Sequence, residues 1–123
     1  MIGQLRATVF DCPDPAELAE FYAELIGATV VQREDGWVSI EDGQGRRLSF
    51  QRSPEHQPPR FPDPTGSQQL HLDVRVEDPD VAERAALALG AKRLDGEGHT
   101  ETGGGFRVFA DPAGHPFCLI WLH

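Results

Sequence analysis

A weak internal repeat limits the possible folds of this 123-residue chain more than any other feature of the sequence. Asp14, followed by Pro, begins a stretch of apolar residues at helical spacing that ends at Gly27. Asp78, also followed by Pro, begins a second such stretch that ends at Gly90. Asp is a good helix N-cap, Pro suits the first helical turn, and Gly commonly ends a helix. The repeat therefore predicts two short helices at corresponding places in two modules.

Each predicted helix carries an apolar face, which we expect to pack against a sheet. In the first helix the face consists of residues at i, i+3, i+4 and i+7, namely Leu18, Phe21, Tyr22 and Leu25. In the second helix the corresponding face consists of Val81, Ala85, Ala88 and Leu89. Both helices are thus predicted to be amphipathic.

Strands are predicted before and after each helix. In residues 70–76, alternation places Leu70, Leu72, Val74 and Val76 on one face and His71, Asp73 and Arg75 on the other. Strands are expected at residues 5–11, 28–33, 37–40, 48–51, 70–76, 91–94, 106–109 and 117–122. Glycines 103–105 are interpreted as a loop. The order is β-α-β-β-β twice, which is an α+β fold.

A proline-rich linker separates the two modules. Module 1 spans about residues 1–53, the linker 54–66 and module 2 about 67–123. Five prolines in residues 54–64 disfavour regular structure there. Each module is too small to hold a core by itself, so we predict a single domain over residues 1–123.

Composition excludes several classes of protein. The chain has 11 Lys and Arg against 20 Asp and Glu, a net charge of −9, which argues against a nucleic-acid partner. The charge is compatible with cationic ligands, although acidity more often serves solubility. No apolar run approaches the length of a membrane span, and the N-terminus lacks a secretory pattern. Two cysteines are too few for a disulfide scaffold. We expect a cytoplasmic protein that contacts neither membrane nor nucleic acid.

The ordered series of motifs resembles the vicinal oxygen chelate superfamily, which contains glyoxalase I, extradiol dioxygenases, bleomycin-resistance proteins and glyoxalase-like domains. The motifs are Asp14-Pro15, Glu20-Phe21-Tyr22, Leu25-Ile26-Gly27-Ala28, His71-Leu72-Asp73-Val74, Leu89-Gly90-Ala91 and Asp111-Pro112-Ala113-Gly114-His115-Pro116-Phe117-Cys118-Leu119. The sequence is most similar to the glyoxalase-like subgroup. The resemblance implies two βαβββ modules that form a curved mixed sheet around a ligand cleft, with the helices outside, and a homodimer.

The resemblance also implies where a metal would bind. Metal-using members take ligands from the first and last strands of each module, and the repeat places these positions at Ala7, Ser49, His71 and Cys118. Only His71 matches the family pattern, so we predict no family-type metal site and no cofactor. Cys118 and His71 would hold a soft ion only with a third donor from a loop, such as His99 or His115. The carboxylate base of the isomerases is also missing, because its positions hold Ser49 and Cys118.

The remaining polar strip on the expected cleft supplies the candidate ligand-binding residues. They are Trp37, Arg47, Ser49, Gln51, His71, Asp73, Arg75, Phe106 and Cys118. Other roles remain open for four of these residues. Asp73 and Arg75 would also suit pairing with side chains of neighbouring strands. Cys118 would also suit a buried apolar position, and Trp37 would suit packing in the core or in a dimer interface.

These residues support several functional hypotheses. The first is a metal-independent protein that binds a small molecule of unknown identity. The second is a lyase, isomerase or oxygenase with a rebuilt active site, in which His71 is the candidate acid or base. The third is an antibiotic-sequestering resistance protein. A regulatory partner module is a further alternative.

Overall fold

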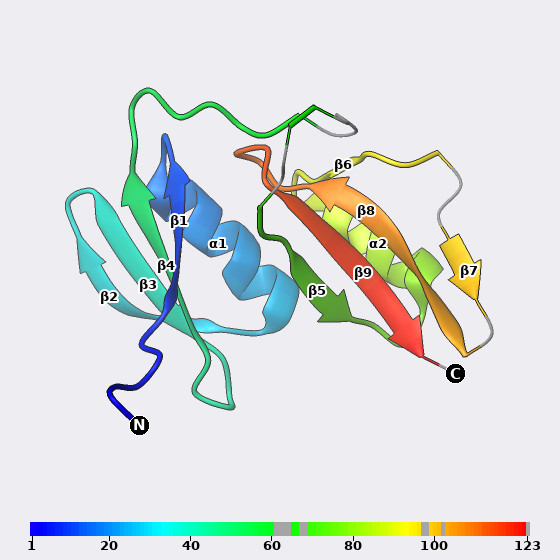
Figure 1. Ribbon diagram of the computed structural model, residues 1–123, viewed down its shortest axis with the longest axis horizontal. Coiled ribbons are helices and arrows are strands. Elements are labelled where there is room, and N and C mark those ends of the chain that lie inside the picture. Colours follow the sequence, from blue (N-terminus) through cyan, green and yellow to red (C-terminus); the bar gives the residue numbers. More distant parts are fainter. Residues whose placement is uncertain (61–64, 67–68, 97–98, 102, 123) are drawn as a thin grey trace. The chain divides into compact units, whose positions relative to one another are not determined.

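A computed structural model shows the arrangement of helices and strands (Figure 1). The structure describes residues 1–60, 65–66, 69–96, 99–101 and 103–122. The chain divides into two compact units, unit 1 (Met1–His56) and unit 2 (Gln57–His123). In the part of the predicted linker that is described, residues 54–60 and 65–66 form neither helix nor strand, as expected from the prolines.

Unit 1 is a four-stranded mixed sheet, sheet 1, with one helix packed on it. Its elements are β1 (Thr8–Cys12), α1 (Pro15–Ile26), β2 (Thr29–Glu34), β3 (Trp37–Glu41) and β4 (Arg47–Arg52). The strand order is β1-β4-β3-β2, with β1 parallel to β4 and the other neighbours antiparallel. The edge strands are therefore β1 and β2.

Unit 2 repeats this plan in a five-stranded sheet, sheet 2. Its elements are β5 (Leu72–Arg75), α2 (Pro79–Ala88), β6 (Lys92–Arg93), β7 (His99–Glu101), β8 (Gly104–Ala110) and β9 (Pro116–Leu122). The order is β5-β9-β8-β6, with β5 parallel to β9, and β7 pairs with β8. The α+β class and the two βαβββ modules are confirmed. The predicted glycine loop is shorter than expected, because Gly104 and Gly105 already belong to β8.

The strand registers confirm that the units are related residue by residue. Val9 lies beside Ser49 in unit 1, and Asp73 lies beside Cys118 in unit 2. The residue numbers of corresponding positions differ by 73 − 9 = 64 in the first strand of each unit and by 118 − 49 = 69 in the last strand. The sequence repeat has the same offsets, because Asp14 corresponds to Asp78 (78 − 14 = 64) and Asp42 to Asp111 (111 − 42 = 69).

Both helices begin and end as the sequence predicts. The Asp14 carboxylate accepts a hydrogen bond from the backbone N–H of Glu17 at 3.2 Å, and Asp78 caps α2 in the same way. Gly27 and Gly90 have φ angles of +69° and +111°, which residues with a Cβ rarely adopt. Among the described residues, no helix has the length and apolar character to cross a membrane.

The core of unit 1 forms between α1 and sheet 1. Tyr22 is completely buried, and its ring lies 5.3 Å from that of Phe10 and 5.7 Å from that of Phe50. Leu18 and Phe21 are also buried. The predicted apolar face of α1 is thus confirmed.

The predicted apolar face of α2 is wrong. Val81 and Leu89 are 52% and 38% exposed, and Ala85 and Ala88 are exposed as well. The only buried residue of α2 is Ala86, which corresponds to Tyr22 because 86 − 22 = 64. A small residue suffices there because sheet 2 supplies the bulk of this core with three fully buried side chains, Phe109, Phe117 and Leu119.

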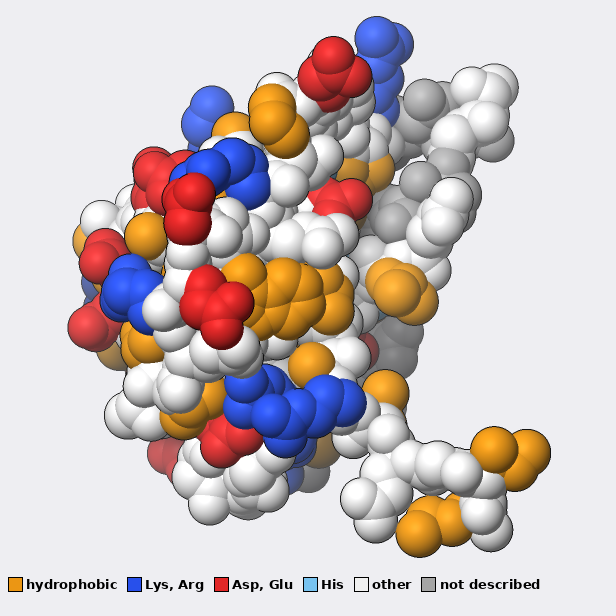
Figure 2. Space-filling view, turned by 90° about the vertical axis from the view of Figure 1, so that its left-hand side faces the viewer, with side chains coloured by type: hydrophobic (Ala, Val, Ile, Leu, Met, Phe, Trp, Pro, Cys, Tyr) orange, Lys and Arg blue, Asp and Glu red, His pale blue; other side chains and the backbone are white. Residues whose placement is uncertain are grey.

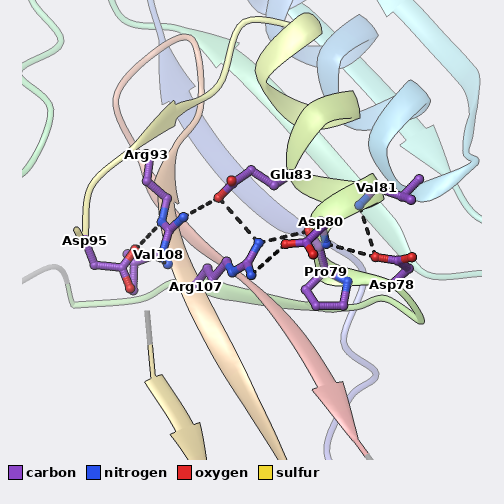
Figure 3. Close-up of polar contacts among 9 residues, drawn as sticks. All are labelled: Asp78, Pro79, Asp80, Val81, Glu83, Arg93, Asp95, Arg107 and Val108. Atoms are coloured by element: carbon purple, nitrogen blue, oxygen red, sulfur yellow. Dashed lines mark hydrogen bonds and ion pairs between the residues drawn. The ribbon is translucent and has the colours of Figure 1, made fainter. Parts of the chain in front are cut away.

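Charged side chains connect α2 to sheet 2 (Figure 3). Arg107 Nη2 donates to Asp80 Oδ1 at 2.9 Å, and Arg107 Nη1 lies 3.7 Å from Glu83 Oε1. Glu83 also accepts a hydrogen bond from Arg93, whose Nε donates to Asp95 Oδ1 at 2.6 Å. We name these five residues the α2 charge network. It identifies the face of sheet 2 on which α2 lies.

Candidate functional site

The predicted ligand-binding residues of unit 2 lie on the face of sheet 2 opposite α2, which we name the helix-free face. Arg107 of β8 reaches α2, so its neighbours Phe106 and Val108 point to the other side of the sheet. Arg93 likewise lies over the ring of Phe109 on the α2 side, 5.6 Å from its centroid. Alternation along β8 therefore separates the two faces.

Two rows of neighbouring residues cross the helix-free face. One row is Asp73, Cys118 and Val108, and the other is Arg75, Ile120 and Phe106. The polar members belong to β5, an edge strand, whereas β9 and β8 contribute mostly apolar residues. This face therefore combines a polar strand with an adjacent apolar surface.

Three chemically different side chains meet beside β5. His71 Nε2 lies 3.3 Å from Asp73 Oδ1, and both side chains are about half exposed. The Cys118 thiol completes the group, since donor atoms of all three residues lie within 4.8 Å of one another. We name His71, Asp73 and Cys118 the donor cluster.

The Cys118 thiol is held in its protonated form. Burial, together with the nearby carboxylates of Asp73 and Asp95, raises the pKa of Cys118 to about 11. A thiol with this pKa is a weak nucleophile near neutral pH. The Cys118 side chain is therefore not a nucleophile unless a base or a bound metal ion removes the thiol proton.

The predicted site residues of unit 1 share one face of sheet 1, but each is hydrogen-bonded to another side chain of unit 1. Arg47 donates from Nη1 to Glu41 Oε1 at 3.0 Å and from Nη2 to Gln32 Oε1 at 2.7 Å. Its side chain is 10% exposed. The guanidinium of Arg47, a predicted ligand-binding group, is already paired with the carboxylate of Glu41.

Ser49, Trp37 and Gln51 are also hydrogen-bonded within unit 1. The hydroxyls of Ser49 and Ser39 are 2.7 Å apart and buried, and Trp37 Nε1 donates to Ser39 Oγ at 3.0 Å. Gln51 Nε2 donates to Asp11 Oδ1 at 2.7 Å. On the side of Figure 1 where β2 lies, Figure 2 shows acidic and basic side chains interspersed around hydrophobic ones. The interspersed charges agree with the ion pairs of unit 1, such as Arg47 with Glu41 and Arg52 with Asp35.

The residues present do not fit the metal centre that the superfamily implies. Ala7 has no donor atom, and the hydroxyl of Ser49 is buried against Ser39. Only His71 and Cys118 remain of the four positions, whereas zinc and iron sites take at least three protein ligands. No step of chemistry can be assigned to a four-position centre in this chain.

The structure supplies a third donor near His71 and Cys118, but from a strand and not from a loop. Asp73 takes this place because the parallel pairing of β5 with β9 puts it beside Cys118. His115 instead pairs with Asp111 in the β8–β9 turn, at 3.0 Å. The side chain of His99 lies outside the described residues. The signal in the sequence was the alternation in residues 70–76, which places Asp73 on the same strand face as His71.

Comparison of the sequence with known protein families identifies one family that matches the chain. The sequence model of the glyoxalase-like domain matches residues 7–120. No curated protein sequence matches the chain.

Solved structures of the same fold cover nearly the whole chain. A glyoxalase/bleomycin resistance protein/dioxygenase family enzyme from Burkholderia phytofirmans has a TM-score of 0.76 and 16% identity, covering 98% of this chain and 100% of its own. A glyoxalase family protein from Bacillus cereus has a TM-score of 0.78 and 14% identity, covering 99% and 95%. A fosfomycin resistance protein from Listeria monocytogenes has a TM-score of 0.74 and 15% identity, covering 100% and 96%. At these identities the similarity shows the fold.

Proposed function

Because the chain belongs to the glyoxalase-like domain family, we propose that it binds a small molecule on the helix-free face of sheet 2. The observation that carries the proposal is the placement of His71, Asp73 and Arg75 along one edge of an apolar surface. Small-molecule sites combine an apolar lining with a few polar groups that fix orientation. The candidate residues of unit 1 are already hydrogen-bonded to Ser39, Glu41, Gln32 and Asp11, so they are less available to bind a ligand.

The chemistry of this face suggests the kind of ligand. Phe106 and Ile120 are half-buried and offer an apolar contact, while Arg75 in the same row offers a guanidinium. Arg pairs with carboxylates and phosphates through two parallel hydrogen bonds. The ligand we propose has an apolar body and an anionic or hydrogen-bonding end.

Binding of this ligand, in our proposal, requires no metal ion. Support comes from the loss of donors at Ala7 and Ser49, which removes the four-position centre. The polar groups of β5 can hydrogen-bond a ligand directly.

A thermal-shift screen of metal-stripped protein against small aromatic carboxylates and organic phosphates tests the proposal. A ligand at 100 times its Kd adds about 2.7 kcal/mol to the free energy of unfolding. We expect shifts in the unaltered protein that are lost in Arg75→Gln and kept in Asp11→Asn, the corresponding position of unit 1. Equal shifts in both variants, or none in the unaltered protein, would contradict the proposal.

A second candidate is an enzyme with a rebuilt site around His71. The 3.3 Å contact between His71 Nε2 and Asp73 Oδ1 favours it, because a carboxylate can orient an imidazole for proton transfer. In this case compounds found in the screen are converted, and His71→Ala abolishes turnover while the thermal midpoint is unchanged. Turnover that persists in His71→Ala would exclude this role.

A third candidate is sequestration of an antibiotic, which the similarity to a fosfomycin resistance protein favours. The test adds fosfomycin and a cationic glycopeptide to the same screen. Shifts with the antibiotic and not with the carboxylates would support this candidate over the first.

We also propose a cytoplasmic homodimer. The two cysteines, both described, are buried and form no disulfide, as in proteins of reducing compartments. Exposed Val30 and Val31 on edge strand β2 offer a surface that a second copy would cover. Sedimentation velocity of the intact chain measures the oligomeric state, and a monomer at micromolar concentration would contradict the proposal.

A further inference from the structure

The donor cluster offers the ligand types of a transition-metal site within one unit. His71, directly before β5, contributes an imidazole nitrogen, and Asp73 of β5 contributes a carboxylate oxygen. Cys118 of the adjacent strand β9 contributes a sulfur. Zinc is bound in proteins by these three kinds of atom. We propose that the donor cluster binds a thiophilic divalent cation, with Zn²⁺ as the reference ion.

The spacing of the donor atoms is close to what such an ion needs. Zinc lies about 2.0–2.3 Å from nitrogen, oxygen and sulfur ligands, so tetrahedral neighbours lie roughly 3.3–3.8 Å apart. His71 Nε2 and Asp73 Oδ1 already lie 3.3 Å apart, and the largest separation in the cluster is within 4.8 Å. His71 and Asp73 are exposed enough to rotate toward the sulfur, whereas burial fixes Cys118.

Charge in the cluster also matches a divalent cation. A neutral imidazole, a carboxylate and a thiolate together carry two negative charges, which one divalent ion neutralises. Binding displaces the thiol proton, because only the thiolate is a metal ligand. Three protein ligands leave a fourth position for water or another small ligand, as in open zinc sites.

This site differs from the four-position set of the superfamily. Ala7 and Ser49 take no part, and Asp73 corresponds to Val9 in unit 1, since 73 − 9 = 64. Unit 1 consequently holds no copy of the cluster. Over the part of the chain that the structure describes, it is the one group of three such donors. The donor cluster shares His71 and Asp73 with the proposed ligand site, but the inference does not rest on the proposed function, because the cluster needs no organic ligand to bind an ion.

Titration of the reduced, metal-stripped full chain with Co²⁺ tests the site. A cysteine thiolate bound to Co²⁺ gives a near-ultraviolet charge-transfer band, and added Zn²⁺ should remove it. We expect one Co²⁺ per chain and loss of the band in Cys118→Ser. His71→Ala and Asp73→Asn should each weaken Co²⁺ binding more than about tenfold, the loss typical of removing even an outer partner of a metal ligand.

Asp11→Asn is the matched control, because Asp11 lies on the first strand of unit 1 and should leave Co²⁺ binding unchanged. If Cys118→Ser fails to fold, the two variants of exposed residues, His71→Ala and Asp73→Asn, decide the question. Absence of the band in the unaltered protein would overturn the proposal. Unchanged affinity in both of these variants would overturn it as well. The experiment contains no organic ligand, so its failure is separate from failure of the thermal-shift screen.

Discussion

The two units share a backbone plan but place their polar side chains on different strands of the helix-free faces. In unit 1 the polar groups lie on the central strands, where Arg47 bonds with Glu41 and Ser49 with Ser39. In unit 2 the central positions are mostly apolar, and the polar residues lie on the edge strand β5 (Asp73 and Arg75) or directly before it (His71). Polar side chains that are hydrogen-bonded within the protein stabilise the fold, whereas exposed polar side chains beside an apolar surface are available to bind a ligand.

The helices differ in a complementary way. α1 inserts Tyr22 into an aromatic core, whereas α2 presents Ala86 at the corresponding position and is connected through the α2 charge network. The apolar contact that α1 makes through Tyr22 is replaced at α2 by ion pairs, while the apolar core of unit 2 comes mainly from sheet 2. We infer that unit 1 provides the larger share of packing stability and that unit 2 carries the candidate site. The following experiments test this division.

The largest effect is expected from Tyr22→Ala in unit 1. Removing a completely buried aromatic side chain should lower the free energy of unfolding by about 3–5 kcal/mol. The corresponding change in unit 2, Ala86→Gly, should cost about 1 kcal/mol from helix propensity. Urea unfolding measures both, with Trp37 fluorescence in a Trp121→Phe background reporting unit 1 and Trp121 fluorescence in a Trp37→Phe background reporting unit 2.

Equal losses in these two variants would contradict the division of packing between the units. A loss in Tyr22→Ala that appears equally in both fluorescence signals would show that the units unfold together. The comparison between them would then apply to local packing alone.

The next largest effect is expected from Gly104→Ala at the start of β8. Gly104 has a φ of +154°, and a Cβ built there would lie 2.1 Å from the backbone oxygen of Trp121. Strain and displacement of β9 should together cost about 2–4 kcal/mol. The matched variant in unit 1 is Gly27→Ala, where φ is +69° but no atom lies within 4 Å of the added Cβ. It should cost about 1 kcal/mol, and thermal unfolding that ranks the pair in the opposite order would exclude the steric explanation.

Local signals explain why much of the fold could be predicted from the sequence. Asp14 and Asp78 act as caps through neighbouring N–H groups, so a few residues determine each helix start. Asp42 and Asp111 likewise accept from backbone N–H groups two and four residues later, which repeats the same turn at an offset of 111 − 42 = 69. Helix starts and turns that depend on contacts within five residues can therefore be predicted directly from the sequence.

The exposed face of α2 and the donor cluster could not be predicted in the same way. Whether Ala85 or Ala86 is buried depends on the bulk that Phe109 and Phe117 supply from distant strands. The place of Asp73 beside Cys118 depends on the β5–β9 register, which periodicity alone does not determine. Both features depend on which segments meet, and this information is not local.

A smaller effect is expected when the α2 charge network is broken by Arg107→Met. Arg107 pairs with Asp80, and its guanidinium lies 5.4 Å from the centroid of the Trp121 ring. Losing both contacts should cost about 1–2 kcal/mol. Arg46→Met in unit 1 is the control, since Arg46 is mostly exposed and its pair with Asp42 should contribute less than the contacts of Arg107. Urea unfolding in low and high salt measures the difference, and a loss that salt leaves unchanged would point to packing instead of charge.

The smallest effect is expected in acid and concerns Asp95. Burial by itself would raise the pKa of Asp95, but hydrogen bonds from Arg93 and from the Val108 N–H outweigh it and lower the pKa below 3.8. A carboxyl whose pKa is lower in the folded state stabilises the fold fully above its unfolded pKa. This contribution disappears as pH falls through the folded pKa, so unit 2 should lose stability below about pH 4. Asp95→Asn should flatten this acid limb in Trp121 fluorescence and leave the Trp37 signal unchanged, because the pairing belongs to unit 2 alone. An acid limb of unchanged slope in the variant would mean that other carboxyl groups cause the acid sensitivity of unit 2.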